Sequence, residues 1–164
     1  EMMEEKSLLW QYGADILTAP GMDAERRIMQ HGQTSCFAHS VAVAYVSLLL
    51  ARRLHLHLDE RSLVRGALLH DYFLYDWHVP DASHRLHGFR HARWALENAR
   101  QEFDLNPVEM DVILKHMFPL NLTPPACRES AVVCCADKIC AVLEVAAAFC
   151  PLIRVPGTGS AAAH

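Results

Sequence analysis

The chain has 164 residues, of which 52% are hydrophobic and 21% charged, and this fits one folded domain rather than a disordered segment. Its net charge of −4 gives no general attraction for nucleic acid or an anionic membrane, so we expect neither as a partner. Six cysteines without CxxC spacing, together with no recognisable signal peptide, favour reduced thiols and a cytoplasmic location. The eleven histidines are unusual and call for an explanation from their positions.

The beginning of the chain predicts two helices. Apolar residues at helical spacing indicate a first helix over residues 1–18, which Pro20-Gly21 would end. Asp23 can cap a second, short helix that runs through Met29. We assign residues 1–34 to an N-terminal helical extension packed on the core.

The middle of the chain predicts a long helix followed by a shorter one. The long helix extends from about Ser35 to Leu54 and turns an apolar face inward. Asp59 is a good N-cap for the next helix, which carries His70-Asp71. Residues 77–87 are polar and contain a proline, which indicates a loop.

Three more helices are predicted in the last part. One covers about 88–103, and the next begins at Asn106-Pro107-Val108-Glu109 and stops near Met117. The last, about 128–149, is apolar almost all round, which predicts a central position. No strand-like alternation is visible, so we expect an all-α helical bundle over residues 35–150, followed by a flexible tail over 151–164.

His70 and Asp71 follow directly on an apolar stretch, Ala67-Leu68-Leu69. A charged group in such surroundings needs compensation, and a bound cation is the simplest source. The alternative is a helix end at which Asp71 only accepts hydrogen bonds.

Other polar residues on apolar helix faces favour the bound cation over the hydrogen-bonded helix end. The helical spacing turns an imidazole or carboxylate inward on each of four further helices, and with the central pair they make a set of six. The set consists of His39, His70, Asp71, His91, His116 and Asp137. Imidazole and carboxylate together suit Fe, Mn, Ni, Co or Zn, and six ligands with a shared carboxylate suit two divalent ions. We expect Asp71 to be the bridge.

The order His, His-Asp, His, His, Asp resembles the HD-domain superfamily of metal-dependent phosphohydrolases in its six-ligand dinuclear form. The segments that carry the resemblance lie between about Ser35 and Phe149. They are Phe37-Ala38-His39-Ser40, Leu68-Leu69-His70-Asp71, His91-Ala92-Arg93-Trp94-Ala95, Leu114-Lys115-His116 and Ala136-Asp137-Lys138. The resemblance implies His39, His70, Asp71 and Asp137 at one metal and His91, His116 and the bridging Asp71 at the other.

At two places the sequence differs from one branch of the HD-domain superfamily. In the cyclic-dinucleotide phosphodiesterases the His-Asp pair is typically followed by Gly-Lys, and the later histidine by Gly-Tyr-Pro. Here Tyr72-Phe73-Leu74 and Met117-Phe118-Pro119 stand in those places. This argues against cyclic di-GMP, and the layout looks more like the small proteins that cleave dinucleoside polyphosphates.

The leading hypothesis is therefore a hydrolase of phosphoester or phosphoanhydride bonds that uses a metal-bridged hydroxide on a small phosphorylated, nucleotide-like substrate. The same six-ligand arrangement is also that of di-iron HD-type oxygenases. A non-catalytic HD-type binding scaffold is a third hypothesis, and uptake of no metal would favour it. The sequence does not fix the oligomeric state.

Several basic residues are candidates for contacts with substrate. Lys138 follows Asp137 directly and could reach a phosphate in catalysis, or it could be a solvated charge on its helix. Arg90, Arg93 and Lys115 flank ligand histidines, as a phosphate clamp would, although each alone is more often a surface charge. His87 precedes the helix of His91 and could touch substrate.

Overall fold

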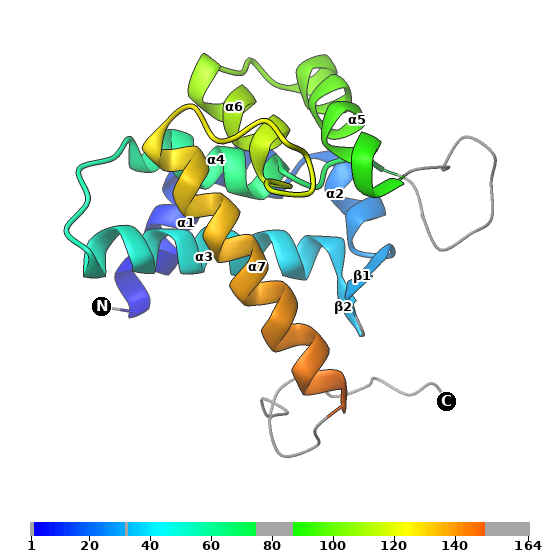
Figure 1. The fold of residues 1–164 in the computed structure, drawn as a ribbon, viewed down its shortest axis with the longest axis horizontal. Coiled ribbons are helices and arrows are strands. Elements are labelled where there is room, and N and C mark those ends of the chain that lie inside the picture. Colours follow the sequence, from blue (N-terminus) through cyan, green and yellow to red (C-terminus); the bar gives the residue numbers. More distant parts are fainter. Residues whose placement is uncertain (1, 32, 75–86, 150–164) are drawn as a thin grey trace.

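The computed structural model describes residues 2–31, 33–74 and 87–149, and these residues form seven helices and one short β-ribbon (Figure 1). The predicted all-α class is confirmed. The helices are α1 (Met2–Leu17), α2 (Pro20–Glu25), α3 (Cys36–Arg53), α4 (Glu60–Leu69), α5 (His87–Glu102), α6 (Pro107–Lys115) and α7 (Arg128–Phe149). The strands are β1 (Met29–His31) and β2 (Thr34–Ser35). Nearly all of the predicted loop and the whole predicted tail lie outside the described residues.

Three helices begin at side-chain caps that satisfy otherwise unpaired backbone N–H groups. The hydroxyl of Ser35 accepts from the backbone N–H of Ala38, and Asp59 accepts from that of Ser62. Asn106 and Glu109 form a reciprocal capping box at the start of α6. The predicted caps at Asp59 and Asn106 are therefore confirmed, and they fix where α4 and α6 start.

The segment between α1 and α3 differs from the prediction. The second helix begins with Pro20, which lies in its first turn, and ends at Glu25. The predicted span from Asp23 to Met29 was therefore wrong. The fixed φ of a proline suits the first turn of a helix, which explains the earlier start. Met29 instead opens β1, which pairs antiparallel with β2. Strands of three and two residues are too short to show the alternation that marks a strand.

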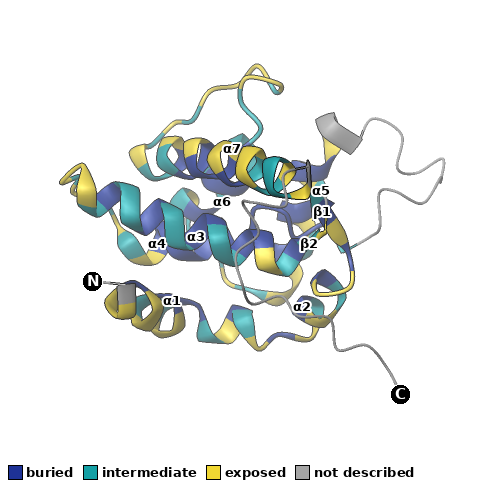
Figure 2. Cartoon of the chain, turned by 90° about the horizontal axis from the view of Figure 1, so that it is seen from below, coloured by how far each residue is buried: buried dark blue, intermediate teal, exposed yellow. Residues whose placement is uncertain are grey.

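Helices α3 and α4 pack against each other at the centre of the molecule. Figure 2 shows α1 and α2 on one side of this pair and α7 on the other, while α6 packs against both α4 and α7. One continuous core joins all seven helices. Among its buried members are Leu9, Ile16, Met22, Val43, Leu48, Leu63, Leu68, Ala95, Val112, Ile113 and Val133.

The last helix is only partly central. Val133 and Ala136 in its first half are buried. Val142 and Leu143 further along are 67% and 55% exposed, and this end of α7 projects past α3 (Figure 1). The prediction of a central position was therefore wrong for the second half of α7, because an apolar surface all round a helix does not require it to be buried all along its length. No described helix is long and apolar enough to cross a bilayer.

Candidate metal centre

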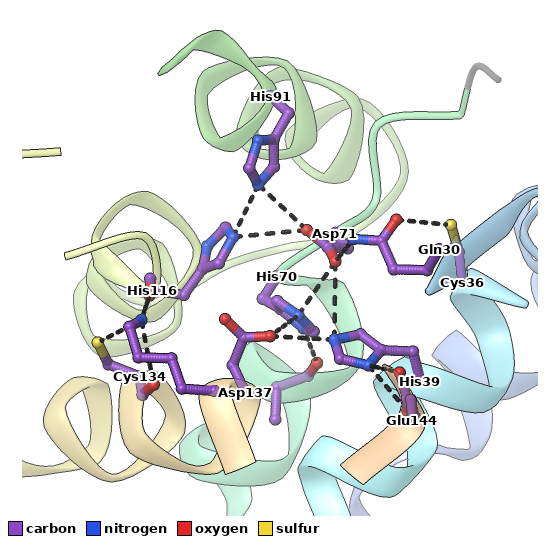
Figure 3. Close-up of polar contacts among 12 residues, drawn as sticks. Gln30, Cys36, His39, His70, Asp71, His91, His116, Cys134, Asp137 and Glu144 are labelled. Carbon is purple, nitrogen blue, oxygen red and sulfur yellow. Dashed lines mark hydrogen bonds and ion pairs between the residues drawn. The ribbon is translucent and has the colours of Figure 1, made fainter. Parts of the chain in front are cut away.

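The six predicted ligands meet at one buried point (Figure 3). His39 comes from α3, His91 from α5 and Asp137 from α7, whereas His70-Asp71 and His116 follow the last residues of α4 and α6. All six are at most 8% exposed. Five helices thus contribute to one cluster of polar side chains inside an apolar core.

Asp71 lies at the middle of the cluster, and its two oxygens face different histidines. Oδ1 is 3.3 Å from Nε2 of His91 and 3.4 Å from Nε2 of His116. Oδ2 is 3.3 Å from Nε2 of His70 and 3.9 Å from Nε2 of His39. This is the arrangement expected of a carboxylate shared between two binding positions.

Two of the histidines are oriented by the helix ends that carry them. His70 and His116 are the C-cap residues of α4 and α6, and each places its Nδ1 close to the carbonyl oxygen three residues earlier, at 2.7 Å from Ala67 and 2.8 Å from Ile113. A carbonyl only accepts, so each Nδ1 carries the hydrogen. In the neutral ring Nε2 then presents a lone pair to the centre of the cluster, as a metal ligand must.

His39 is held between two carboxylates. Its Nδ1 is 2.9 Å and 3.0 Å from the two oxygens of Glu144, and its Nε2 is 3.0 Å from Oδ1 of Asp137. Burial alone lowers the pKa of His39, but its hydrogen bonds to Asp137 and Glu144 outweigh burial and raise that pKa to about 9. Without a bound cation, the ring of His39 is therefore doubly protonated. Its Nε2 proton lies between His39 and Asp137, two residues that a cation would share.

The donor atoms fit divalent transition metals. The unsatisfied buried side-chain atoms of the described residues include Nε2 of His70 and Oδ1 of Asp71, both aimed into the cluster. Such buried atoms are costly unless something binds them. Ligands about 2.0–2.2 Å from one ion lie roughly 2.8–3.6 Å from each other at the angles of octahedral to tetrahedral coordination. Nε2 of His91 and Nε2 of His116 are 2.9 Å apart, and Oδ1 of Asp71 is 3.3 Å from the first and 3.4 Å from the second.

The charges of the cluster favour the ionised carboxylates that metal binding requires. Burial would raise the pKa of Asp71, but the neighbouring His70 and close contacts with the rings of His116 and His91 hold that pKa well below its usual range. Burial is likewise outweighed at Asp137, whose pKa is lowered by its hydrogen bond with His39 and by the nearby ring of His70. Burial lowers the pKa of His116, which favours the neutral ring that binds metals.

Sequence reasoning missed three polar residues at this centre. Gln30 donates from Nε2 to Oδ2 of Asp71 at 2.5 Å, and its Oε1 accepts from the thiol of Cys36 at 3.3 Å. The ring of His31 meets that of His39 edge-on, with 5.1 Å between centroids. Glu144 is the third, through its contact with His39. Gln30 and His31 lie on β1, which no sequence pattern predicted, whereas Glu144 lies seven residues after Asp137, two turns further along the same face of α7, and this spacing could have identified it.

The chain directly after Asp71 is fixed from two sides. The amide of Asn98 on α5 donates to the carbonyls of Tyr72 and Phe73, at 3.1 and 3.0 Å. Buried Glu25 on α2 accepts from the backbone N–H of Leu74 at 3.3 Å. Burial and the negative charge of Asp71 raise the pKa of Glu25 to about 8. The N-terminal helices therefore help to position the central carboxylate.

A cavity of about 690 Å³ opens onto the cluster. Its wall includes Asp71, His91, His116 and Asp137, so a small molecule can reach the binding positions. Lys138 also lines it, but its Nζ donates to the carbonyl oxygen of His116 at 2.8 Å.

The other predicted substrate residues do not belong to the described cavity wall. Arg90 and Arg93 are exposed on α5, and Cζ of Arg90 lies 5.9 Å from the ring centroid of Trp94. Lys115 is half-buried at the end of α6. The side chain of His87 lies outside the described residues. The structure thus brings the six metal candidates together with Lys138 and leaves Arg90, Arg93 and Lys115 apart from them.

Comparison with known proteins agrees with this geometry. The family model of the HD domain matches residues 36–142, well over half of the chain and a span that contains all six ligands. The chain belongs to the HD-domain family. HD domains are associated with divalent metals and with metal-dependent hydrolysis, and the buried groups of this HD domain could hold such metals. Searches among curated proteins and among solved structures gave no match.

Proposed function

We propose that this HD domain is a dinuclear metal-dependent phosphohydrolase that acts on a small phosphorylated substrate. The observation that carries the proposal is the position of Asp71, whose two oxygens each face their own pair of histidines beside an open cavity. His39, His70, Asp71 and Asp137 would hold one divalent ion, and His91, His116 and Asp71 the other. In sites of this kind the bound ions supply Lewis acidity and lower the pKa of a water molecule.

The residues of the chain would prepare the site for this chemistry. His70 and His116 are oriented by backbone carbonyls, so little rearrangement is needed to present Nε2. Gln30 donates to Asp71 and thereby limits the rotation of the central carboxylate. The segment after Asp71 is tied to Asn98. Such pre-organisation is what electrostatic stabilisation of a transition state requires.

Contacts with the substrate phosphate are part of the proposal. Lys138 lies in the cavity wall, and a catalytic role requires that it exchange its bond to the carbonyl of His116 for one to phosphate. Arg90, Arg93 and Lys115 lie near ligand histidines in sequence and would need substrate or neighbouring chain to bring them to the phosphate. His87 is proposed on its sequence position alone.

Hydrolysis of phosphate compounds, followed by release of inorganic phosphate or of the alcohol or nucleotide product, tests the proposed function. Protein loaded with Mn²⁺, Ni²⁺, Co²⁺, Zn²⁺ or Fe²⁺ is assayed on phosphomonoesters, phosphodiesters and nucleoside polyphosphates, with oxygen consumption followed in parallel. We expect turnover in the wild type and none with His70→Ala or Asp71→Asn. His57→Ala is the matched control, because His57 is exposed and outside the cluster. Retained activity in the His70 or Asp71 variant, or oxygen consumption without hydrolysis of any phosphate compound, would contradict the proposal.

A further inference from the structure

The cavity beside the metal centre has an apolar side. Its lining includes Met117, Pro119 and Leu120, which follow α6, and Ala141 of α7. We call these four residues the apolar wall. Leu120 is 46% exposed although it borders a concave site. Large apolar side chains that stay in contact with water at a cavity commonly mark the surface that a ligand covers.

Apart from the proposed metal ions, positively charged side chains are scarce among the described lining residues of the cavity. Lys138 is the one lysine or arginine among its described lining residues. Its Nζ contacts the carbonyl of His116 at 2.8 Å and both the carbonyl and Sγ of Cys134 at 3.3 Å. These contacts occupy the three N–H groups of an ammonium. Ligands with several phosphates usually require several free cations or backbone N–H groups.

The size of the cavity indicates how much of a ligand it could hold. About 690 Å³ lies within the range of sites that enclose molecules of drug size. One phosphoryl group at the metal positions would fill only a small part of it. The remainder faces the apolar wall, where burial of carbon surface is favourable at roughly 25 cal/mol per Å².

We propose that the ligand of this site carries a single phosphoryl group and an uncharged, mainly apolar organic group that packs on the apolar wall. This rests on the proposed function in that the ligand is then the substrate, a phosphomonoester. Its hydrolysis breaks the bond between phosphorus and the ester oxygen and forms one between phosphorus and a water oxygen. One proton of that water passes to the departing alcohol, and the products are the free alcohol and inorganic phosphate, with no change in oxidation state.

Kinetics with esters of different size test this specificity. We expect kcat/KM of the metal-loaded wild type to be higher for 1-naphthylmethyl phosphate than for methyl phosphate, whose alcohol is an equally poor leaving group, or for nucleoside di- and triphosphates. Leu120→Asn should lower kcat/KM for the naphthylmethyl ester about three- to tenfold, from loss of apolar contact, and leave the methyl ester unchanged. Leu122→Asn is the matched control, because Leu122 is 88% exposed and outside the cavity wall. It should change neither rate.

Binding separates this inference from the proposed function. Calorimetry with 1-naphthylphosphonate and methylphosphonate, which contain no ester bond to hydrolyse, measures the same preference without turnover. Tighter binding of the naphthyl compound that Leu120→Asn weakens, in a protein that hydrolyses no ester, would support the apolar wall while refuting the hydrolase. Equal binding of the two phosphonates, equal effects of Leu120→Asn on both, or a preference for polyphosphates would overturn the inference.

Discussion

The contact between Glu144 and His39 offers a test of one metal position by itself. Nδ1 of His39 lies 2.9 and 3.0 Å from the two oxygens of Glu144, whose side chain is 13% exposed. Glu144 touches no other predicted ligand in the described contacts. Replacing it with glutamine keeps the size and a carbonyl acceptor, and removes only the charge. We therefore expect a weaker hydrogen bond to Nδ1 of His39, with the fold intact.

The magnitude follows from the kind of hydrogen bond that is lost. A hydrogen bond to a charged group contributes about 1.5–3 kcal/mol and a neutral one about 0.5–1.5 kcal/mol, so Glu144→Gln should cost about 1 kcal/mol, or roughly fivefold in metal affinity. Glu144→Ala leaves the buried Nδ1–H of His39 without its partner. Loss of the group that orients a ligand histidine typically costs about 10–100-fold in metal affinity. The two variants should therefore form a graded series.

Competition with a chromophoric chelator measures the two stepwise metal dissociation constants. We expect Glu144→Gln to weaken one of them about fivefold and to leave the other unchanged. Glu97→Gln, on the exposed face of α5, is the control. Glu144 lies towards the C-terminal end of α7, where a negative charge opposes the helix dipole, so its removal should not destabilise the helix. Unchanged affinity for both ions, or equal weakening of both, would refute the reasoning.

Three further predictions concern the centre and the core. Asp71→Asn should lower the bound metal from about two ions per chain to none, because both positions share this carboxylate; one remaining ion, measured by mass spectrometry, would argue against the bridge. The pKa of Glu25 is about 8 in the fold against 4.5 as its ordinary value, so the folded chain holds this proton more tightly. In metal-free protein, the contribution of Glu25 to the free energy of unfolding should therefore be largest below pH 4.5. It should be lost as the pH rises to 8, by as much as about 5 kcal/mol. Urea titrations of Glu25→Gln should show that loss abolished, and an unchanged pH profile would contradict it. Gly66→Ala would place a Cβ 2.7 Å from Cβ of Val112; in urea titrations it should cost about 1–3 kcal/mol of unfolding free energy through overpacking, and Val112→Ala in the same chain should restore little of it, because Cβ of Val112 remains. Unchanged stability of Gly66→Ala would contradict this prediction.

Much of this centre could be predicted because helical periodicity is a local property. His39 and Asp137 each lie on a helix whose neighbours at three- and four-residue spacing are apolar, so their direction follows from the sequence. The helix starts at Asp59 and Asn106 were readable for the same reason, since capping depends on residues within one turn. The clustering of the six predicted ligands in the structure follows from these local features and the family resemblance.

The features that were not predicted depend on contacts between distant segments or on very short elements. Gln30 reaches Asp71 only because β1 folds back beside the site, and the ribbon is too short for its sequence to show a period. The partner of Lys138 is a backbone carbonyl at the end of α6, and a backbone acceptor leaves no sequence signal. The exposed second half of α7 likewise depends on where this helix passes beyond α3. Tertiary placement, rather than propensity, decided each of these.

The central claim is that six side chains hold two metal ions with Asp71 between them. Mass spectrometry of metal per chain, on protein purified without chelator or oxygen, tests it most directly. We expect close to two divalent transition-metal ions per chain, falling to about one when His91 and His116 are both replaced by alanine. A single ion in the wild type, unaffected by those two replacements, would contradict the dinuclear centre and leave His39, His70, Asp71 and Asp137 as the ligands of one metal.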